Sequence, residues 1–149
     1  MLMSILSWWF TNFRQRRLEW CIALYTVGFG AFLMLPFVSF ATAGYRGVLT
    51  LMSEFSWGLV YLLTGILHNV ALHVNGRAAW TPFARVVTLF LNSQVFLAFA
   101  LAFAHSNPAG SGVFTYAVIA TLFCWVALWA AGEDCGREYK IWKEGRRHA

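Results

Sequence analysis

The fold is decided by the stretch WGLVYLLTGILHNVALHVNGRAAWTPFARVVTLFLNSQVFLAFALAFAH (57–105), in which two apolar runs, 57–74 and 86–105, flank a short polar connector at 75–82. Each run has about 20 residues, and at about 1.5 Å rise per residue this length matches the hydrocarbon core of a bilayer, about 30 Å thick. Two such runs joined by so short a connector predict an antiparallel transmembrane hairpin, with spans at about 57–74 and 83–105.

The hairpin also carries polar side chains within or near the predicted membrane depth. Antiparallel spans bring these groups to similar depth, so the sequence predicts an interhelical hydrogen-bond cluster. Polar groups inside a membrane are costly unless they are paired. Three interpretations stay open: bonds that hold helices together, a wet path or small polar ligand site, and polar faces that pair only in an oligomer. The predicted cluster consists of His68, Asn69, His73, Asn92, Ser93 and Gln94.

Two further apolar runs, at about 20–43 and 113–131, complete four predicted spans. Residues 2–13 place apolar and aromatic side chains along one helical stripe, which is typical of an amphipathic helix on a membrane surface. The predicted fold is therefore all-α: a single domain over 1–149, an integral membrane four-helix bundle with an amphipathic N-terminal segment. Charge pairs in the polar tail at 132–149 favour continuation of the last helix. Small residues suit close helix packing, and the predicted packing positions are Gly28, Gly30, Ala98 and Ala102.

The composition excludes a soluble protein. Hydrophobic residues make up 60% of the 149 residues and charged residues 11%, against about 25% charged in soluble domains. Ten of the eleven Lys and Arg residues lie near what becomes one side of the membrane, and Arg46 alone lies on the other. The positive-inside rule then places both termini in the cytoplasm of a bacterial inner membrane. This asymmetry explains the net charge of +5, so the basic residues do not indicate nucleic-acid binding. Arg14, Arg16 and Arg17 are expected to contact lipid headgroups.

The first span raises a question of processing. Ala41-Thr42-Ala43 has the small-x-small form of a signal-peptidase site. However, the apolar stretch before it is longer than the core of a signal peptide, about 7 to 15 residues. The length favours an uncleaved span over cleavage after Ala43.

The sequence predicts no catalytic or metal site and no cofactor. The carboxylates of Glu54, Glu133 and Asp134 are expected outside the core and at opposite ends of the bundle. Glycine-rich phosphate loops, metal-spaced His/Cys clusters and nucleophile–base arrangements are absent from the sequence. A b-type haem needs two axial histidines at one depth. His68 and His105 differ by roughly 16 Å along the membrane normal, so haem would need His68 from two chains.

The connector carries a resemblance to a known group of proteins. HVNGR (73–77) followed by WTPFAR (80–85) resembles the central connector of small uncharacterised membrane proteins encoded by bacteriophages and prophages. The resemblance covers about a dozen residues of the 149 and carries no assigned site residues. It implies a phage role at the inner membrane, such as lysis or exclusion of competing phage. Holins are often shorter, with fewer spans, so lysis is not the first expectation.

The predicted function is non-catalytic. The protein is expected to act by helix–helix assembly in the bilayer, as a homo-oligomer or within a larger membrane complex. The alternative is a pore-forming, holin-like or channel protein in which Asn69, Asn92 and Gln94 line a wet interior of an oligomer. A third alternative is an electron-transfer membrane subunit that uses His68.

Overall fold

The structure is a computed structural model that describes residues 16–35, 40, 45–75 and 80–145. Most of these residues are helical and none forms a β-strand, which confirms the all-α fold class. The amphipathic segment expected at 2–13, the Ala41–Ala43 site and residues 76–79 of the connector lie outside the described residues. The helices are α2 (Arg17–Leu33), α3 (Arg46–Leu51), α4 (Glu54–Val74), α5 (Thr81–Ser106), α6 (Ser111–Val118), the π-helical turn η2 (Ile119–Phe123) and α7 (Cys124–Gly145).

Three helical segments within the described residues are long and apolar enough to cross a membrane: α4, α5 and the continuous helix Ser111–Glu144, with mean hydropathies of 1.4, 2.0 and 2.0. The helix expected over 20–43 instead begins at Arg17 and ends at Leu33, so it has 17 residues. Its end precedes Pro36, and proline disfavours helical backbone at the residue before it. The last helix continues well past residue 131, which confirms the predicted extension into the polar tail.

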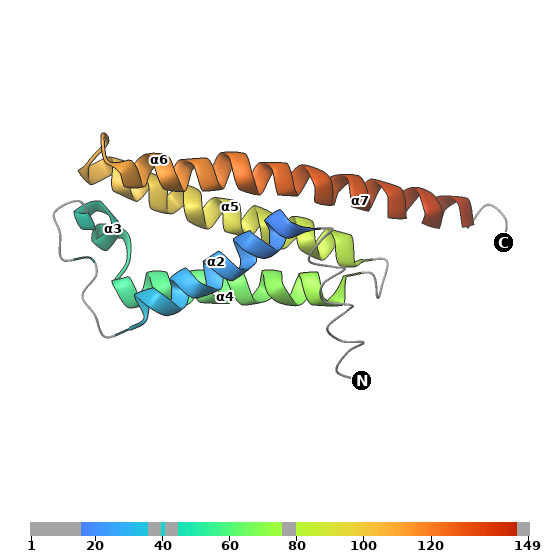
Figure 1. Cartoon of the computed structure of the whole chain (residues 1–149), viewed down its shortest axis with the longest axis horizontal. Coiled ribbons are helices and arrows are strands. Elements are labelled where there is room, and N and C mark those ends of the chain that lie inside the picture. Colours follow the sequence, from blue (N-terminus) through green and yellow to red (C-terminus); the bar gives the residue numbers. More distant parts are fainter. Residues whose placement is uncertain (1–15, 36–39, 41–44, 76–79, 146–149) are drawn as a thin grey trace.

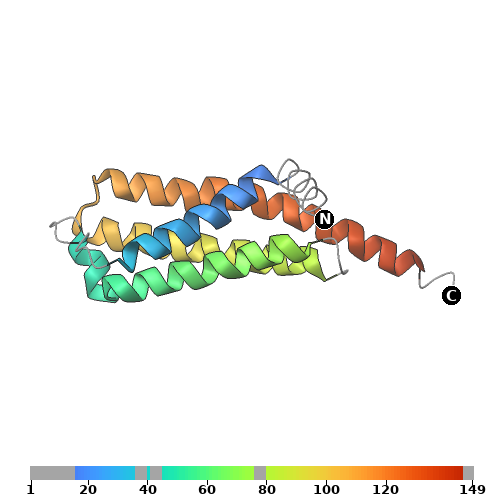
Figure 2. The same ribbon diagram turned by 60° about the horizontal axis from the view of Figure 1, so that its bottom comes forward.

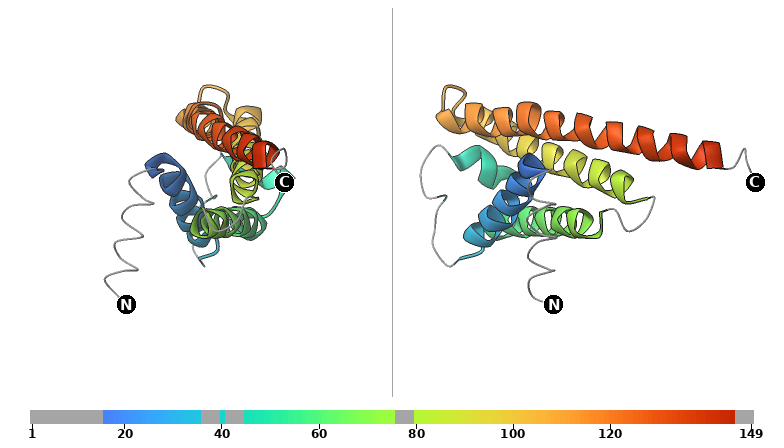
Figure 3. Two further views of the ribbon diagram at one scale, coloured as in Figure 1. Left: turned by 90° about the vertical axis from the view of Figure 1, so that its right-hand side faces the viewer. Right: turned by 45° about the vertical axis from the view of Figure 1, so that its right-hand side comes forward.

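The long helices lie side by side (Figures 1 and 2). α2 packs against α4, while α5 contacts α3, α4, α6 and α7 and so forms the centre of the arrangement. The start of α2, the end of α4 and the start of α5 meet at one end, which we call the basic end because Arg16, Arg17 and Arg85 lie there. α7 continues past this end, beyond the other helices (Figure 3). Arg46, in α3, lies at the opposite end.

Aromatic rings fill the half of the interior nearer to α3. The fully buried ring of Phe99 in α5 is at the centre of this core. Six rings surround it, with centroids 4.8 to 5.9 Å away, and five of the six meet it edge to face. Such edge-to-face pairs are favourable because the positive ring edge meets the negative ring face. The surrounding rings are those of Phe29, Phe40, Trp57, Tyr61, Phe103 and Tyr116.

The short helix α3, which the sequence pattern did not reveal, closes this end of the core. Gly47 of α3 lies so close to the Ala102 carbonyl oxygen of α5 that a Cβ there would clash. The indole Nε1 of Trp57 donates a hydrogen bond of 3.0 Å to the Val48 carbonyl oxygen, which fixes α3 to α4. Of the two predicted packing alanines, Ala102 is buried and Ala98 is half-buried.

Glycine also controls the contact between α2 and α4. A Cβ on Gly30 would lie 2.8 Å from the Gly58 carbonyl oxygen and closer still to the Leu62 amide nitrogen. Gly28, the other predicted packing glycine of α2, is exposed, and a Cβ built there would meet no other side chain or helix of the described residues within 4 Å. Within this chain, close helix packing therefore depends on Gly30, and the packing role expected for Gly28 is not observed.

This difference gives a matched pair of variants. Gly30→Ala should lower the free energy of unfolding by about 1–3 kcal/mol, because backbone atoms of α4 must move away from the added methyl group. Gly28→Ala should leave stability unchanged or raise it slightly, because alanine is the better helix former. Thermal unfolding of the two variants in the same detergent measures the difference. Equal effects of the two substitutions would contradict the observed α2–α4 contact.

Candidate functional site

A network of buried charges joins three helices at the basic end. Arg85 of α5 is fully buried, and its guanidinium contacts two carboxylates. Its Nε and Nη2 donate to the two oxygens of Glu19 in α2 at 2.9 and 2.5 Å. Its Nη1 donates to Oδ2 of Asp134 in α7 at 2.7 Å and to Oδ1 of Asn75 at 3.3 Å. The bidentate pairing with Glu19 fixes both groups in one plane.

Asp134 is the point where further cations meet the network. Arg16 donates to Asp134 Oδ2 at 2.9 Å, and Arg137 of the next helical turn pairs with Oδ1. Burial lowers the pKa of the Arg16 guanidinium, and the positive charge of Arg85 lowers it further. The nearby carboxylates of Glu19 and Asp134 act in the opposite direction. An arginine remains charged in a protein under all ordinary conditions, so the network contains three cations and two anions.

Local helix geometry explains why these residues meet. Glu19 lies in the first turn of α2, where a carboxylate interacts favourably with the helix dipole. Pro82, in the first turn of α5, sets the start of that helix and so the place of Arg85 one turn further on. Asp134 lies on the same face of α7 as Ala127 and Ala131, both buried against the other helices. A recess of about 330 Å³ lies beside the charge network. It is lined by Arg16, Glu19, Arg85, Ala130, Glu133, Asp134 and Arg137.

A second polar group lies deeper along α5. Asn92 and His68 are both fully buried, and Asn92 Nδ2 lies 3.3 Å from His68 Nδ1. The same Nδ2 donates to the Thr88 carbonyl oxygen at 2.8 Å. If Asn92 donates both bonds, Nδ1 is the acceptor and His68 carries its proton on Nε2. His68 Nε2, Asn92 Oδ1 and the Tyr61 hydroxyl have no hydrogen-bond partner among the described residues.

The structure brings only part of the predicted polar cluster together. His68 and Asn92 meet as expected from their depths. Ser93 faces the other way and donates to the Ala120 carbonyl oxygen in η2 at 3.0 Å, which links α5 to the last helix. Asn69 donates to the Gly65 carbonyl oxygen of its own helix and lines a shallow outer groove between α2 and α4. His73 and Gln94 are exposed.

The charge network is not apparent from the sequence. Asp134, expected outside the core, is half-buried and binds the fully buried Arg85. Arg16 pairs with Asp134, Arg17 is exposed, and Arg14 lies outside the described residues. The contact of these arginines with lipid headgroups stays a prediction. The available signal was Glu19, an acidic residue at the start of an apolar helix, which needs a cation when that helix is buried.

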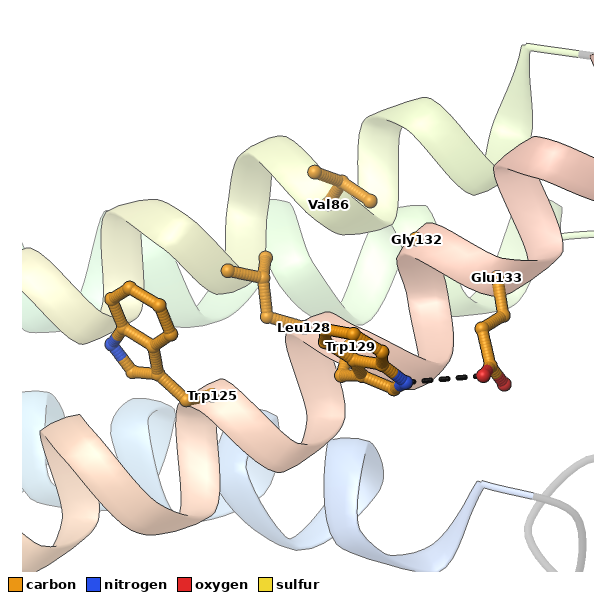
Figure 4. A pocket seen from close by; sticks show the side chains of 6 residues that line it. All are labelled: Val86, Trp125, Leu128, Trp129, Gly132 and Glu133. Atoms are coloured by element: carbon orange, nitrogen blue, oxygen red, sulfur yellow. Dashed lines mark hydrogen bonds between the residues drawn. The ribbon is translucent and has the colours of Figure 1, made fainter.

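An apolar groove runs along the other side of α7. It has a volume of about 460 Å³ and lies between α5 and α7 (Figure 4). The indole Nε1 of Trp129 donates to Glu133 Oε1 at 3.0 Å at its polar end. Trp125 and Trp129 are exposed at 59% and 75%. The lining residues are Val86, Trp125, Leu128, Trp129, Gly132 and Glu133.

The charge network is suited to holding helices together. Every carboxylate oxygen of Glu19 and Asp134 accepts a bond from an arginine, and these bonds join α2, α5 and α7. No group of three or more His, Cys, Asp or Glu side chains in the described ranges could hold a metal ion. No family model matches this chain, and no curated protein or solved structure is significantly similar to it. The class that the fold defines is an all-helical protein with three apolar helices of membrane-spanning length.

Proposed function

We propose that this chain is an integral membrane protein with four crossing helices that acts by assembly in the bilayer and not by catalysis. The three long apolar helices support insertion. α2, at 17 residues, is at the short end of the roughly 17–25 residues that span a bilayer, and it packs along α4 for its length. The positive-inside rule then assigns the basic end, with both chain termini, to the cytoplasm of a bacterial inner membrane.

The observation that carries assembly is the uneven burial of the three long helices. In α4 and α5, 39% and 50% of the most apolar window is buried within the chain, but in the helix Ser111–Glu144 only 17% is buried. Its outward residues include large side chains, among them Phe114, Leu122 and Trp125. A helix with so little contact inside its own chain offers a long face to another protein.

The interior supports assembly over the alternative of a pore. Asn69, Asn92 and Gln94 point in three different directions: into an outer groove, into the core, and toward the outside of α5. The aromatic core around Phe99 fills the half of the bundle nearer to α3. The connector resemblance supports a phage or prophage setting, and it names no reaction.

Two measurements test this proposal, one in the native membrane and one on the purified protein in liposomes. The protein should stay in the membrane pellet after carbonate extraction, as integral membrane proteins do. Chemical crosslinking in the native membrane should yield a discrete oligomer or a stoichiometric complex. Liposomes that contain the protein should retain ions and small dyes over a range of protein densities. Leakage that Asn92→Leu abolishes while the protein stays folded would favour the pore, and a monomer without any crosslinked product would contradict assembly.

A further inference from the structure

Asn75 differs from the other partners of Arg85 in the charge network, because its side chain is a neutral amide. Within the described residues Arg85 donates four hydrogen bonds, and three of them end on the carboxylates of Glu19 and Asp134. The fourth joins Arg85 Nη1 to Asn75 Oδ1 at 3.3 Å. A guanidinium has donors only, so the amide oxygen faces it. The network of three cations and two anions therefore contacts a neutral group where a third anion would balance it.

The residue after Asn75 makes this amide reactive. Asparagine is a thermolabile residue, because the peptide nitrogen of the next residue can attack its side-chain Cγ and close a succinimide ring. Glycine favours this attack, since it has no side chain to hinder its nitrogen and its backbone rotates freely. The sequence has five asparagines, and Asn75 alone is followed by glycine.

The other described asparagines are protected by their surroundings. Asn69 and Asn92 lie inside α4 and α5, where helical hydrogen bonds hold the backbone. Asn107 precedes Pro108, whose nitrogen has no hydrogen to lose. Asn75 instead follows the last residue of α4, with ψ at 136°, outside the helical region. Ring closure needs rotation about this ψ, and the rotation leaves the hydrogen bonds of α4 intact because it redirects only the connector.

We propose that Asn75 is a modification site at which water converts the amide to a carboxylate without an enzyme. The peptide nitrogen of Gly76 loses its proton and bonds to Asn75 Cγ, while the Cγ–Nδ2 bond breaks and Nδ2 takes up a proton and leaves as ammonia. Water then opens the ring and gives aspartate or isoaspartate. The net reaction takes up water and releases ammonia, with no oxidation or reduction. Arg85 favours the attack, because negative charge develops on the Oδ1 that it contacts.

The aspartate product supplies the network with its third anion. Its carboxylate takes the place of the amide oxygen beside Arg85 Nη1. A hydrogen bond between two charged groups is stronger than one to a neutral amide, so the end of α4 is held more firmly to α5. Three cations are then matched by three anions. Conversion at this position therefore stabilises the basic end of the bundle.

The first test follows the side chain itself. The folded protein in detergent and a synthetic peptide of residues 70–80 are incubated in parallel at neutral pH, and mass spectrometry measures the acid formed at each asparagine. Asn75 should convert in both samples, whereas Asn69 and Asn92 of the folded protein should remain amides. Gly76→Ile should slow the conversion about tenfold or more, because a β-branched side chain hinders the attacking nitrogen.

Two results of this test overturn the proposal. One is a folded protein that keeps the Asn75 amide after the peptide has converted, because the fold then protects the site. The other is a conversion in the folded protein that Gly76→Ile does not slow, because the ring is then not the route.

The second test measures the effect of the new charge on the network. Asn75→Asp should raise the thermal unfolding midpoint by about 2–4 °C, because Arg85 gains a charged partner. Asn107→Asp is the matched control and should not raise the midpoint, since Asn107 is exposed at the opposite end of α5. A midpoint of Asn75→Asp at or below that of the wild type overturns the stabilising role of the modification.

Discussion

Arg85→Met is expected to lower the free energy of unfolding by about 3–5 kcal/mol, the typical cost of removing one member of a buried ion pair. The substitution keeps an unbranched side chain of similar length but leaves the carboxylate of Glu19 buried without a cation. Asp134 loses its contact with α5 and keeps only Arg16 and Arg137. Thermal or denaturant unfolding in detergent, followed by tryptophan fluorescence, measures the change.

Two controls separate the network from a general effect of removing an arginine. Arg46→Met, at the opposite end and on an exposed residue, should change stability by less than about 0.5 kcal/mol. The triple variant Arg85→Met with Glu19→Gln and Asp134→Asn should recover most of the loss, because no buried charge is then left unpaired. If Arg85→Met alone is as stable as the wild type, the three-helix network does not hold the fold together.

Phe99→Ala should be the most damaging substitution in the aromatic core, with a loss of about 3 kcal/mol. The alanine removes a ring that contacts six others, and the surrounding helices cannot close the cavity without shifting. In a bilayer the loss comes from packing and not from exposure to water, since lipid tails are as apolar as the core.

Phe90→Ala in the same helix is the matched control. Phe90 is 49% exposed on the outside of α5, so its removal leaves no cavity and should cost less than about 1 kcal/mol. The unfolding midpoints of the two variants, measured side by side, give the comparison. A similar loss for both would mean that the aromatic core contributes nothing specific.

The helices of the hairpin were predictable because they depend on local pattern. Apolar runs of about 20 residues and the Thr81-Pro82 start signal lead directly to α4 and α5. The end of α2 at Leu33 was also within reach, since Pro36 follows it closely. In contrast, the π-helical turn η2 has no such local signal, and its Ala120 carbonyl oxygen accepts a hydrogen bond from Ser93, 27 residues earlier in α5.

The charge network was harder to predict because its members are far apart in sequence. Glu19 and Asp134 each look like a polar residue at a helix end when considered alone. Only the three-dimensional arrangement shows that both face Arg85. Part of the polar cluster was predictable, because the depth of a residue follows from its position in the span. Residues His68 and Asn92 have similar predicted depths, and they are in contact in the structure. The direction in which Asn69 and Gln94 point depends on helix rotation, which tertiary packing decides.

The order in which the chain is made gives the ion network a further consequence. Glu19 and its cation Arg85 are 66 residues apart, which ribosomes synthesise in roughly 3–13 s at about 5–20 residues per second. During that interval the carboxylate of Glu19 has no arginine from α5. Asp134 arrives a further 49 residues later. Glu19 therefore reaches its buried ion pair only after α5 has been synthesised, and nascent chains truncated before Arg85 should leave Glu19 accessible to water.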